Sequence, residues 1–109
     1  MAAGTPKTLV SIAAGDGAAH DYYTVPSGKR TRVVHLHFSN HGSSGGESIS
    51  AAIDTGSSSI SIVPLQSLAQ ANTYDHYSNV GYVLIAGQSI LGSAGPNTSF
   101  IALGYEEAV

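Results

Sequence analysis

The sequence contains no cysteine and very little charge. The absence of cysteine excludes a disulfide framework and a thiolate metal site. Asp, Glu, Lys and Arg make up only 10% of the 109 residues, whereas about 25% is usual in soluble domains. Four basic residues and a net charge of −3 cannot form an extended phosphate-binding surface, so we expect no nucleic-acid partner. Because a small domain with so little charge would have low solubility by itself, we expect other subunits to cover much of its surface.

Long hydrophobic runs are also missing. No segment approaches the roughly 18 uninterrupted apolar residues that would span a bilayer, so we expect no membrane partner. The start, "MAAGTPKTLV", lacks the charged residues and apolar stretch of a secretory signal. The length predicts one domain over residues 1–109, in which residues 1–6 could form an N-terminal arm that orders on a neighbouring subunit.

What the chain does contain is a two-residue alternation of apolar and polar side chains, interrupted by turn residues every eight to twelve positions. This pattern is typical of an all-β sandwich or barrel, and no window has helical periodicity. We expect about nine strands in an antiparallel, jelly-roll-like sandwich of two sheets. The predicted strands lie near residues 7–13, 20–25, 30–40, 48–53, 59–62, 73–78, 80–85, 88–91 and 99–107, with an irregular crossover at 63–72.

The clearest strand is "RTRVVHLHFSN". Its alternation predicts that Val34, Leu36 and Phe38 point to one face, whereas Val33 and the two histidines of the segment point to the other. Those histidines, His35 and His37, would therefore share a face. Imidazoles two residues apart on a strand can chelate a metal, and three copies could surround a trimer axis. A pH-sensitive contact between subunits is the alternative that we favour, and we assign no metal or other cofactor.

The sequence "DTGS" after Asp54 invites a comparison with dimeric aspartic proteases, which share a proton between two carboxylates. "SILGS" resembles the apolar element that braces the catalytic loop of that family. The interval from Asp54 to Gly92 is too short for the family, however, and Pro96 prevents the helix that should follow. Asp and Gly between two Ile/Ser strands favour a hairpin turn, which is the interpretation we prefer.

Three further features have weaker functional interpretations. The segment 42–46, "GSSGG", matches a nucleophile elbow but lacks the strand and helix that this motif requires. Lys29, Arg30 and Arg32 gather three of the four basic residues at one turn, and we expect them to meet an acidic neighbouring subunit. Four tyrosines in short strands could form a sugar-stacking platform. These are Tyr22, Tyr23, Tyr74 and Tyr77.

Two longer stretches resemble a known family. "YTVPSGKRTRVVHLHFSN" and "YVLIAGQSILGSAGPNTSFIALGYEE" are similar to the beginning and end of small β-sandwich structural proteins of tailed bacteriophages. In the Val-Pro-x-Gly-Lys turn, Pro26 fixes φ without offering an N–H, and Gly28 supplies an unusual dihedral. The likeness spans roughly residues 21–107. The histidine pair and the "DTGSSS" hairpin depart from the family pattern.

The resemblance implies a non-enzymatic virion component, assembled in the host cytoplasm. We expect a capsid decoration (cement) protein, as a homo-oligomer that is most simply a trimer, bridging subunits of the major capsid protein or another virion protein. The expected subunit contacts are Lys29, Arg30, Arg32, His35 and His37. A tail or collar accessory, or a carbohydrate-binding module for host recognition, is the alternative. A homodimeric aspartic protease using Asp54 is a further alternative.

Overall fold

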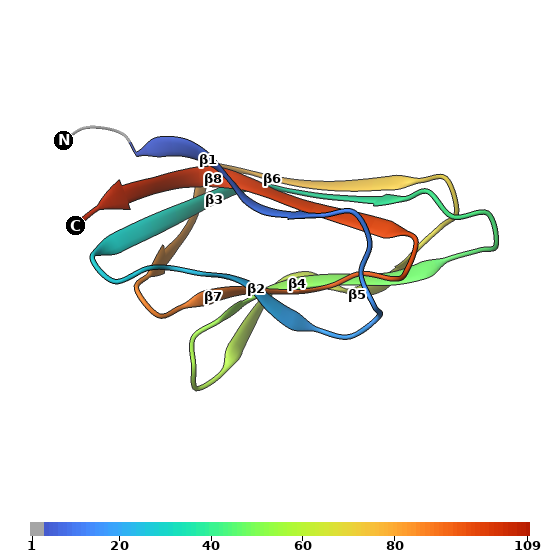
Figure 1. Ribbon diagram of the computed structural model, residues 1–109, viewed down its shortest axis with the longest axis horizontal. Coiled ribbons are helices and arrows are strands. Elements are labelled where there is room, and N and C mark those ends of the chain that lie inside the picture. The colour runs from blue at the N-terminus through green and yellow to red at the C-terminus, as the bar shows by residue number, and fades with distance from the viewer. Residues whose placement is uncertain (1–3) are drawn as a thin grey trace.

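The computed structural model describes residues 4–109 as two antiparallel, four-stranded sheets packed face to face (Figure 1). These residues form eight strands: β1 (Thr5–Ile12), β2 (His20–Thr24), β3 (Lys29–Asn40), β4 (Glu47–Asp54), β5 (Ser59–Leu68), β6 (Thr73–Ile85), β7 (Ser89–Ser93) and β8 (Thr98–Ala108). The predicted all-β sandwich is therefore confirmed. Over the same residues, no helix is long and apolar enough to cross a membrane.

The strand order is that of a jelly roll. One sheet has the order β1-β8-β3-β6 and the other β2-β7-β4-β5. The pairs β1–β8, β2–β7, β3–β6 and β4–β5 are each antiparallel neighbours, as when one long hairpin is wrapped around a barrel. Strands β1 and β2 meet along one side of the sandwich, and β5 and β6 meet along the other.

The predicted number of strands was one too high, because two predicted strands are a single strand, β6. An irregularity at residues 78–81 bends β6 without ending it, so that four of its residues lie opposite Val34 alone. Gly81 adopts a φ of 79° there, and its amide donates a hydrogen bond to Ser78 Oγ at 3.0 Å. The predicted crossover at 63–72 was also wrong in its first half. Strand β5 continues through it to Leu68, paired with β4.

Alternation along β3 contains a shift that the sequence does not reveal. A bulge between Val33 and His35 disturbs the register with both β6 and β8. As a result Val33 is buried in the core, and Val34 is only half-buried. The predicted faces of these two valines are therefore wrong, whereas Leu36 and Phe38 lie inside as expected.

The core lies between the sheets and is centred on two phenylalanine rings. Phe38 and Phe100 are opposite each other in the β3–β8 register and are fully buried. Their centroids are 4.5 Å apart at an interplanar angle of 5°. Tyr22 packs edge-on against Phe100, with centroids 6.0 Å apart. Branched aliphatic residues of both sheets complete this core.

The first strand begins earlier than predicted. Thr5 and Pro6, assigned from the sequence to the N-terminal arm, pair with Glu106 and Tyr105 at the start of β1. Residues 1–3 of that predicted arm lie outside the described residues. The start of β1 and the C-terminal end of β8 consequently lie at the same end of the sandwich (Figure 1).

Candidate functional site

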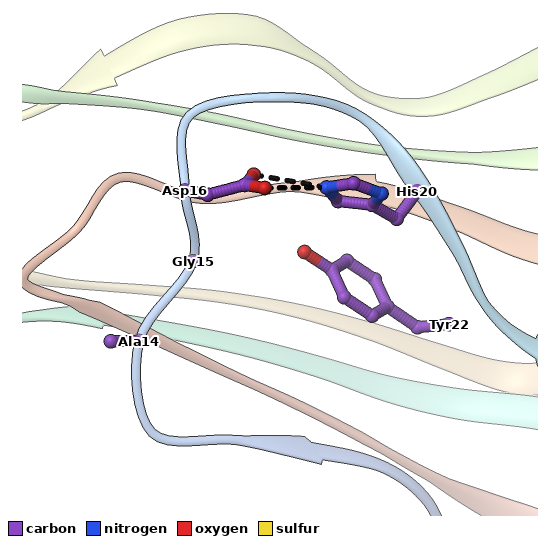
Figure 2. Close-up of a pocket in the computed structure, with 5 residues that line it drawn as sticks. All are labelled: Ala14, Gly15, Asp16, His20 and Tyr22. Atoms are coloured by element: carbon purple, nitrogen blue, oxygen red, sulfur yellow. Dashed lines mark hydrogen bonds and ion pairs between the residues drawn. The ribbon is translucent and has the colours of Figure 1, made fainter.

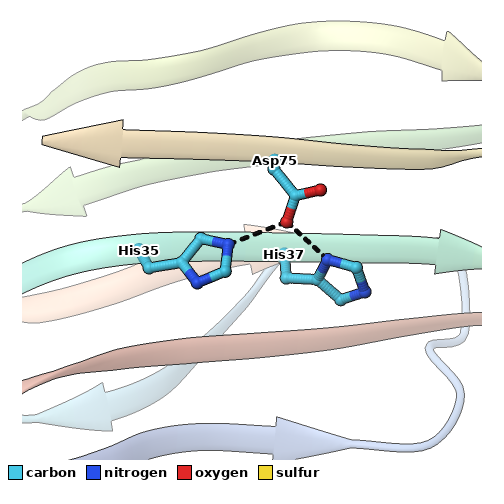
Figure 3. A group of neighbouring side chains, drawn as sticks. All are labelled: His35, His37 and Asp75. Atoms are coloured by element: carbon cyan, nitrogen blue, oxygen red, sulfur yellow. Dashed lines mark hydrogen bonds and ion pairs between the residues drawn. The ribbon is translucent and has the colours of Figure 1, made fainter.

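The predicted histidine pair lies on the outer face of the β1-β8-β3-β6 sheet, joined by an aspartate. His35 and His37 project from β3 on the same face, as the alternation predicts. Asp75 of β6 is directly opposite His37 in the register, and Tyr77 is directly opposite His35. Figure 3 shows both imidazoles turned toward a single carboxylate oxygen.

The distances within this cluster are short. His35 Nε2 lies 2.7 Å from Asp75 Oδ1, and His37 Nδ1 lies 2.6 Å from the same oxygen. Hydrogen bonds from His37 and then from His35 lower the pKa of the Asp75 carboxyl below its ordinary value. The ionised carboxylate can only accept, so both imidazoles donate to it. We call these three residues the His–Asp–His cluster.

The sequence reasoning did not connect Asp75 to the histidine pair. Alternation along "TYDHYS" places Asp75 and Tyr77 on one face. It does not say which strand lies beside β3, or in what register, because that pairing joins residues about 40 positions apart. Long-range register was therefore the missing information.

The basic residues at the β2–β3 turn pair within the chain. Arg30 Nε lies 3.2 Å from Glu107 Oε1, and Arg32 Nη2 lies 4.0 Å from the same oxygen. Glu107 belongs to β8, which neighbours β3. These arginines thus have an acidic partner without a neighbouring subunit. A contact of Lys29, Arg30 or Arg32 with another subunit stays a prediction.

The Asp-Thr-Gly segment forms the turn of the β4–β5 hairpin, which projects from the sandwich (Figure 1). Asp54 Oδ1 accepts a hydrogen bond from the Gly56 amide at 2.9 Å, and the Thr55 amide donates to Ser58 O at 2.9 Å. Gly56 has a φ of 93°, which glycine adopts without strain. The predicted hairpin bend is confirmed.

Asp54 does nevertheless have a carboxylate neighbour, Asp21 of β2. Burial, then a side-chain hydrogen bond and charge repulsion from Asp54, raise the pKa of Asp21 above its ordinary value. Both aspartates belong to one chain, whereas the protease hypothesis requires one from each of two chains. The arrangement is therefore an intrachain acidic pair that is strained when both groups are ionised.

This pair gives a pH-dependent prediction. A raised folded-state pKa contributes stability below the unfolded pKa of about 3.9, and that stability is lost as the pH rises through the folded value. We expect Asp21→Asn to raise the melting temperature at pH 7 by about 1–3 °C, a small gain because exposed charges are screened. At pH 3 the gain should vanish.

The control is Asp16→Asn. A backbone hydrogen bond from Ala18, and then one from His20, lower the pKa of Asp16, so this substitution should not stabilise the protein at pH 7. Thermal unfolding followed by circular dichroism measures both variants. An equal gain for Asp21→Asn at pH 3 and pH 7 would show that the ionised Asp21 carboxylate is not the cause.

Asp16 and His20 form a second, smaller constellation, at a shallow pocket. Figure 2 shows the His20 ring facing the Asp16 carboxylate, with Tyr22 beside them. His20 Nε2 lies 3.0 and 2.8 Å from the two carboxylate oxygens. The pocket has a volume of about 430 Å³ and is also lined by Ala14 and Gly15.

The predicted tyrosine platform is not brought together as one surface. Tyr22, Tyr23 and Tyr74 are partly buried and pack against the core. Tyr23 of β2 donates a hydrogen bond of 2.6 Å to Glu106 Oε2 of β8, which belongs to the other sheet. Tyr77 is exposed and stacks on His35 of the His–Asp–His cluster. The glycine-serine segment 42–46 is a loop between β3 and β4, without the helix of a nucleophile elbow.

Exposed apolar side chains concentrate on one side of the sandwich. Eight large hydrophobic residues are exposed among residues 4–109, and six of them belong to β5 and β6. These six, the β5/β6 apolar edge, are Ile60, Leu65, Tyr77, Val80, Val83 and Ile85. Both strands end their sheets, so each also has an unpaired backbone edge.

No family model matches the chain, and no curated protein matches it significantly. The class of protein is therefore defined by its fold alone, a jelly-roll β-sandwich.

Proposed function

We propose that this chain is a non-enzymatic virion structural protein of a tailed bacteriophage, which decorates the capsid as a homotrimer. The resemblance of residues 23–40 and 82–107 to phage structural sandwiches supports the virion assignment. The jelly-roll order is in keeping with it, because this architecture recurs in viral capsid domains. It recurs in lectins as well, so the fold alone does not select the function.

The observation that carries the proposal is the β5/β6 apolar edge. Edge strands of proteins that remain monomeric usually present charges, prolines or bulges that discourage further pairing. Over its thirteen residues β6 has one acidic residue, Asp75, and β5 has no charged residue at all. Pro64 in β5 and the irregularity at 78–81 in β6 discourage pairing with a further strand at those positions. Val83 and Ile85, however, are half exposed on a regularly paired segment of β6.

A second copy of the chain is the occupant that we assign to this edge. Each copy has a net charge of −3, which is small enough for identical subunits to associate. In a closed ring of three, each copy can present its β5/β6 edge to the next, so that no apolar edge is left open. Contacts with the capsid would then use surfaces outside that ring. A stable contact of this kind buries about 1,200–2,000 Å² in total.

The first test is the mass of the purified chain in solution, by sedimentation equilibrium. We expect a trimer for the wild type and a monomer for the double substitution Val83→Glu, Ile85→Glu. Glutamate is chosen because Arg32 and Arg30 lie opposite these positions in the β3–β6 register and can pair with it. Val109→Glu is the matched control, since Val109 is exposed but lies outside the edge.

The second test is co-sedimentation with capsids from the same phage assembled without this chain. We expect the wild type and Val109→Glu to bind them, and the double variant to bind at least tenfold more weakly because it loses avidity. The proposal would be overturned if the wild type were a monomer at a concentration of about 100 μM and did not bind these capsids. A trimer that does not bind capsids would contradict the decoration role but would support the proposed trimer.

A further inference from the structure

The geometry points to the His–Asp–His cluster as a binding site for a divalent transition-metal ion, with zinc as the reference metal. Its three potential ligand atoms, His35 Nε2, His37 Nδ1 and one carboxylate oxygen of Asp75, all lie within 4.8 Å of one another. They come from two neighbouring strands of one chain, so the site needs no second subunit. It is independent of the proposed role in the virion.

The sheet itself holds the ligands in place. His37 and Asp75 are a cross-strand pair, and His35 is two residues away on the same face of β3. The side chains of His35, His37 and Asp75 are 20%, 29% and 31% exposed. They are thus confined by their neighbours but can be reached from solvent. Ligands on paired strands move less than ligands on loops, which lowers the entropic cost of binding an ion.

Neighbouring side chains fix the orientation of one imidazole. The Tyr77 ring stacks on His35, with centroids 4.2 Å apart and an interplanar angle of 15°. On the other side of β3, Leu103 and Ile101 of β8 are opposite His35 and His37. These two aliphatic residues are half-buried. The cluster therefore lies in a partly apolar surrounding, in which attraction between a cation and a carboxylate is stronger than in open water.

The donor set selects the class of metal. Two imidazole nitrogens and one carboxylate oxygen suit zinc, cobalt or nickel, whereas calcium and magnesium prefer oxygen ligands. Bonds of about 2.0–2.1 Å in a tetrahedron require the ligand atoms to be roughly 3.3 Å apart. The present N···O distances of 2.7 and 2.6 Å mean that each of these separations must lengthen by about 0.6–0.7 Å. Side-chain rotation can provide that movement.

Binding also requires a change of tautomer. Each imidazole now directs an N–H at Asp75 and must offer that nitrogen's lone pair to the ion instead. A neutral imidazole does this by carrying its proton on the other ring nitrogen, Nδ1 of His35 and Nε2 of His37, with no net proton release. Three protein ligands leave at least one position for water or another ligand.

The test is calorimetric titration of the untagged protein with zinc chloride. We expect one ion per chain for the wild type, and at least tenfold weaker binding for His37→Ala and for Asp75→Asn. Cobalt(II) gives an independent measurement, because d–d absorption bands between 500 and 700 nm report tetrahedral nitrogen and oxygen ligation. Those bands should be absent from both variants.

The matched control is His20→Ala. His20 also contacts an aspartate, Asp16, but that constellation offers one imidazole rather than two. His20→Ala should therefore leave zinc binding unchanged. Melting temperatures establish that each variant is folded, and zinc should raise that of the wild type but not that of His37→Ala.

Two results would overturn the inference. One is the absence of saturable zinc binding by the folded wild type at concentrations up to 1 mM. The other is zinc binding that persists in Asp75→Asn and His37→Ala but is lost in His20→Ala, which would place the ion at the Asp16 pocket. Trimer formation by Asp75→Asn is measured separately, so failure of this inference and failure of the assembly proposal are distinguishable.

Discussion

Replacing Phe100 by alanine is expected to lower the free energy of unfolding by about 3–5 kcal/mol. Phe100 is fully buried and stacks on Phe38 across the β3–β8 pair. It also reaches the opposite sheet, where a Cβ on Gly92 of β7 would lie only 2.8 Å from its ring. The truncation would therefore leave a cavity lined by both sheets. Close packing on all sides prevents the neighbouring residues from collapsing into it.

Urea unfolding followed by circular dichroism measures this effect. Tyr105→Ala is the control, because Tyr105 is on the same strand but faces outward and is partly exposed. It should cost less than about 1 kcal/mol. If Phe100→Ala cost no more than Tyr105→Ala, the two sheets could not be packed around Phe100 as described.

Much of the fold could be predicted from the sequence because strand alternation is a local signal. The segment 30–40 shows this best, since it places Leu36 and Phe38 inside and the two histidines outside, as observed. The bend after Asp54 was also predictable, because the tendency of Asp and Gly to form turns acts within a few residues. The presence of two packed sheets follows from the need of every strand to bury one apolar face.

The sequence did not reveal three features that depend on how a strand pairs with its neighbour. The bulge at Val34 exchanges the faces of two similar valines, and nothing in "RVVH" says which of them is inside. Residues 63–68 contain Pro64 and no clean alternation, yet they continue β5 because β4 pairs with them. Asp75 joined the histidines for the same reason, through a register that is set by the whole jelly roll.

The β5/β6 apolar edge and the His–Asp–His cluster share β6, and Tyr77 of the edge stacks on His35 of the cluster, but the residues substituted in the two tests are different. Val83 and Ile85 lie beyond the irregularity at 78–81, whereas Asp75 lies before it. We therefore infer that the two properties separate on mutation. A substitution at Asp75 should remove metal binding from an intact trimer, and the paired glutamates should produce a monomer that still binds zinc.

The second large effect is expected at Asn40, the last residue of β3. Its side chain is almost completely buried and makes three hydrogen bonds that organise the loop after it. Nδ2 donates to Gly45 O and to Leu68 O, both at 3.0 Å, and Oδ1 accepts from the Gly42 amide at 3.0 Å. One amide group thus joins the β3–β4 loop to the end of β5.

Asn40→Asp keeps the shape of the side chain but removes both donors. Two carbonyl oxygens would then face a buried carboxylate, and we expect a loss of about 2–4 kcal/mol at pH 7. Asn72→Asp is the matched control, because Asn72 is exposed and forms its described hydrogen bonds through the backbone. It should cost less than about 0.5 kcal/mol.

The pH dependence identifies the cause of this loss. Burial should raise the folded-state pKa of the new carboxyl group above its unfolded value, so the charged form is what destabilises the fold. Its protonated form regains one O–H donor, and the difference from wild type should therefore shrink as the pH falls from 7 to 4. Urea unfolding at both pH values provides the comparison. A loss that stays constant over this range would mean that packing, rather than the missing donors, explains the importance of Asn40.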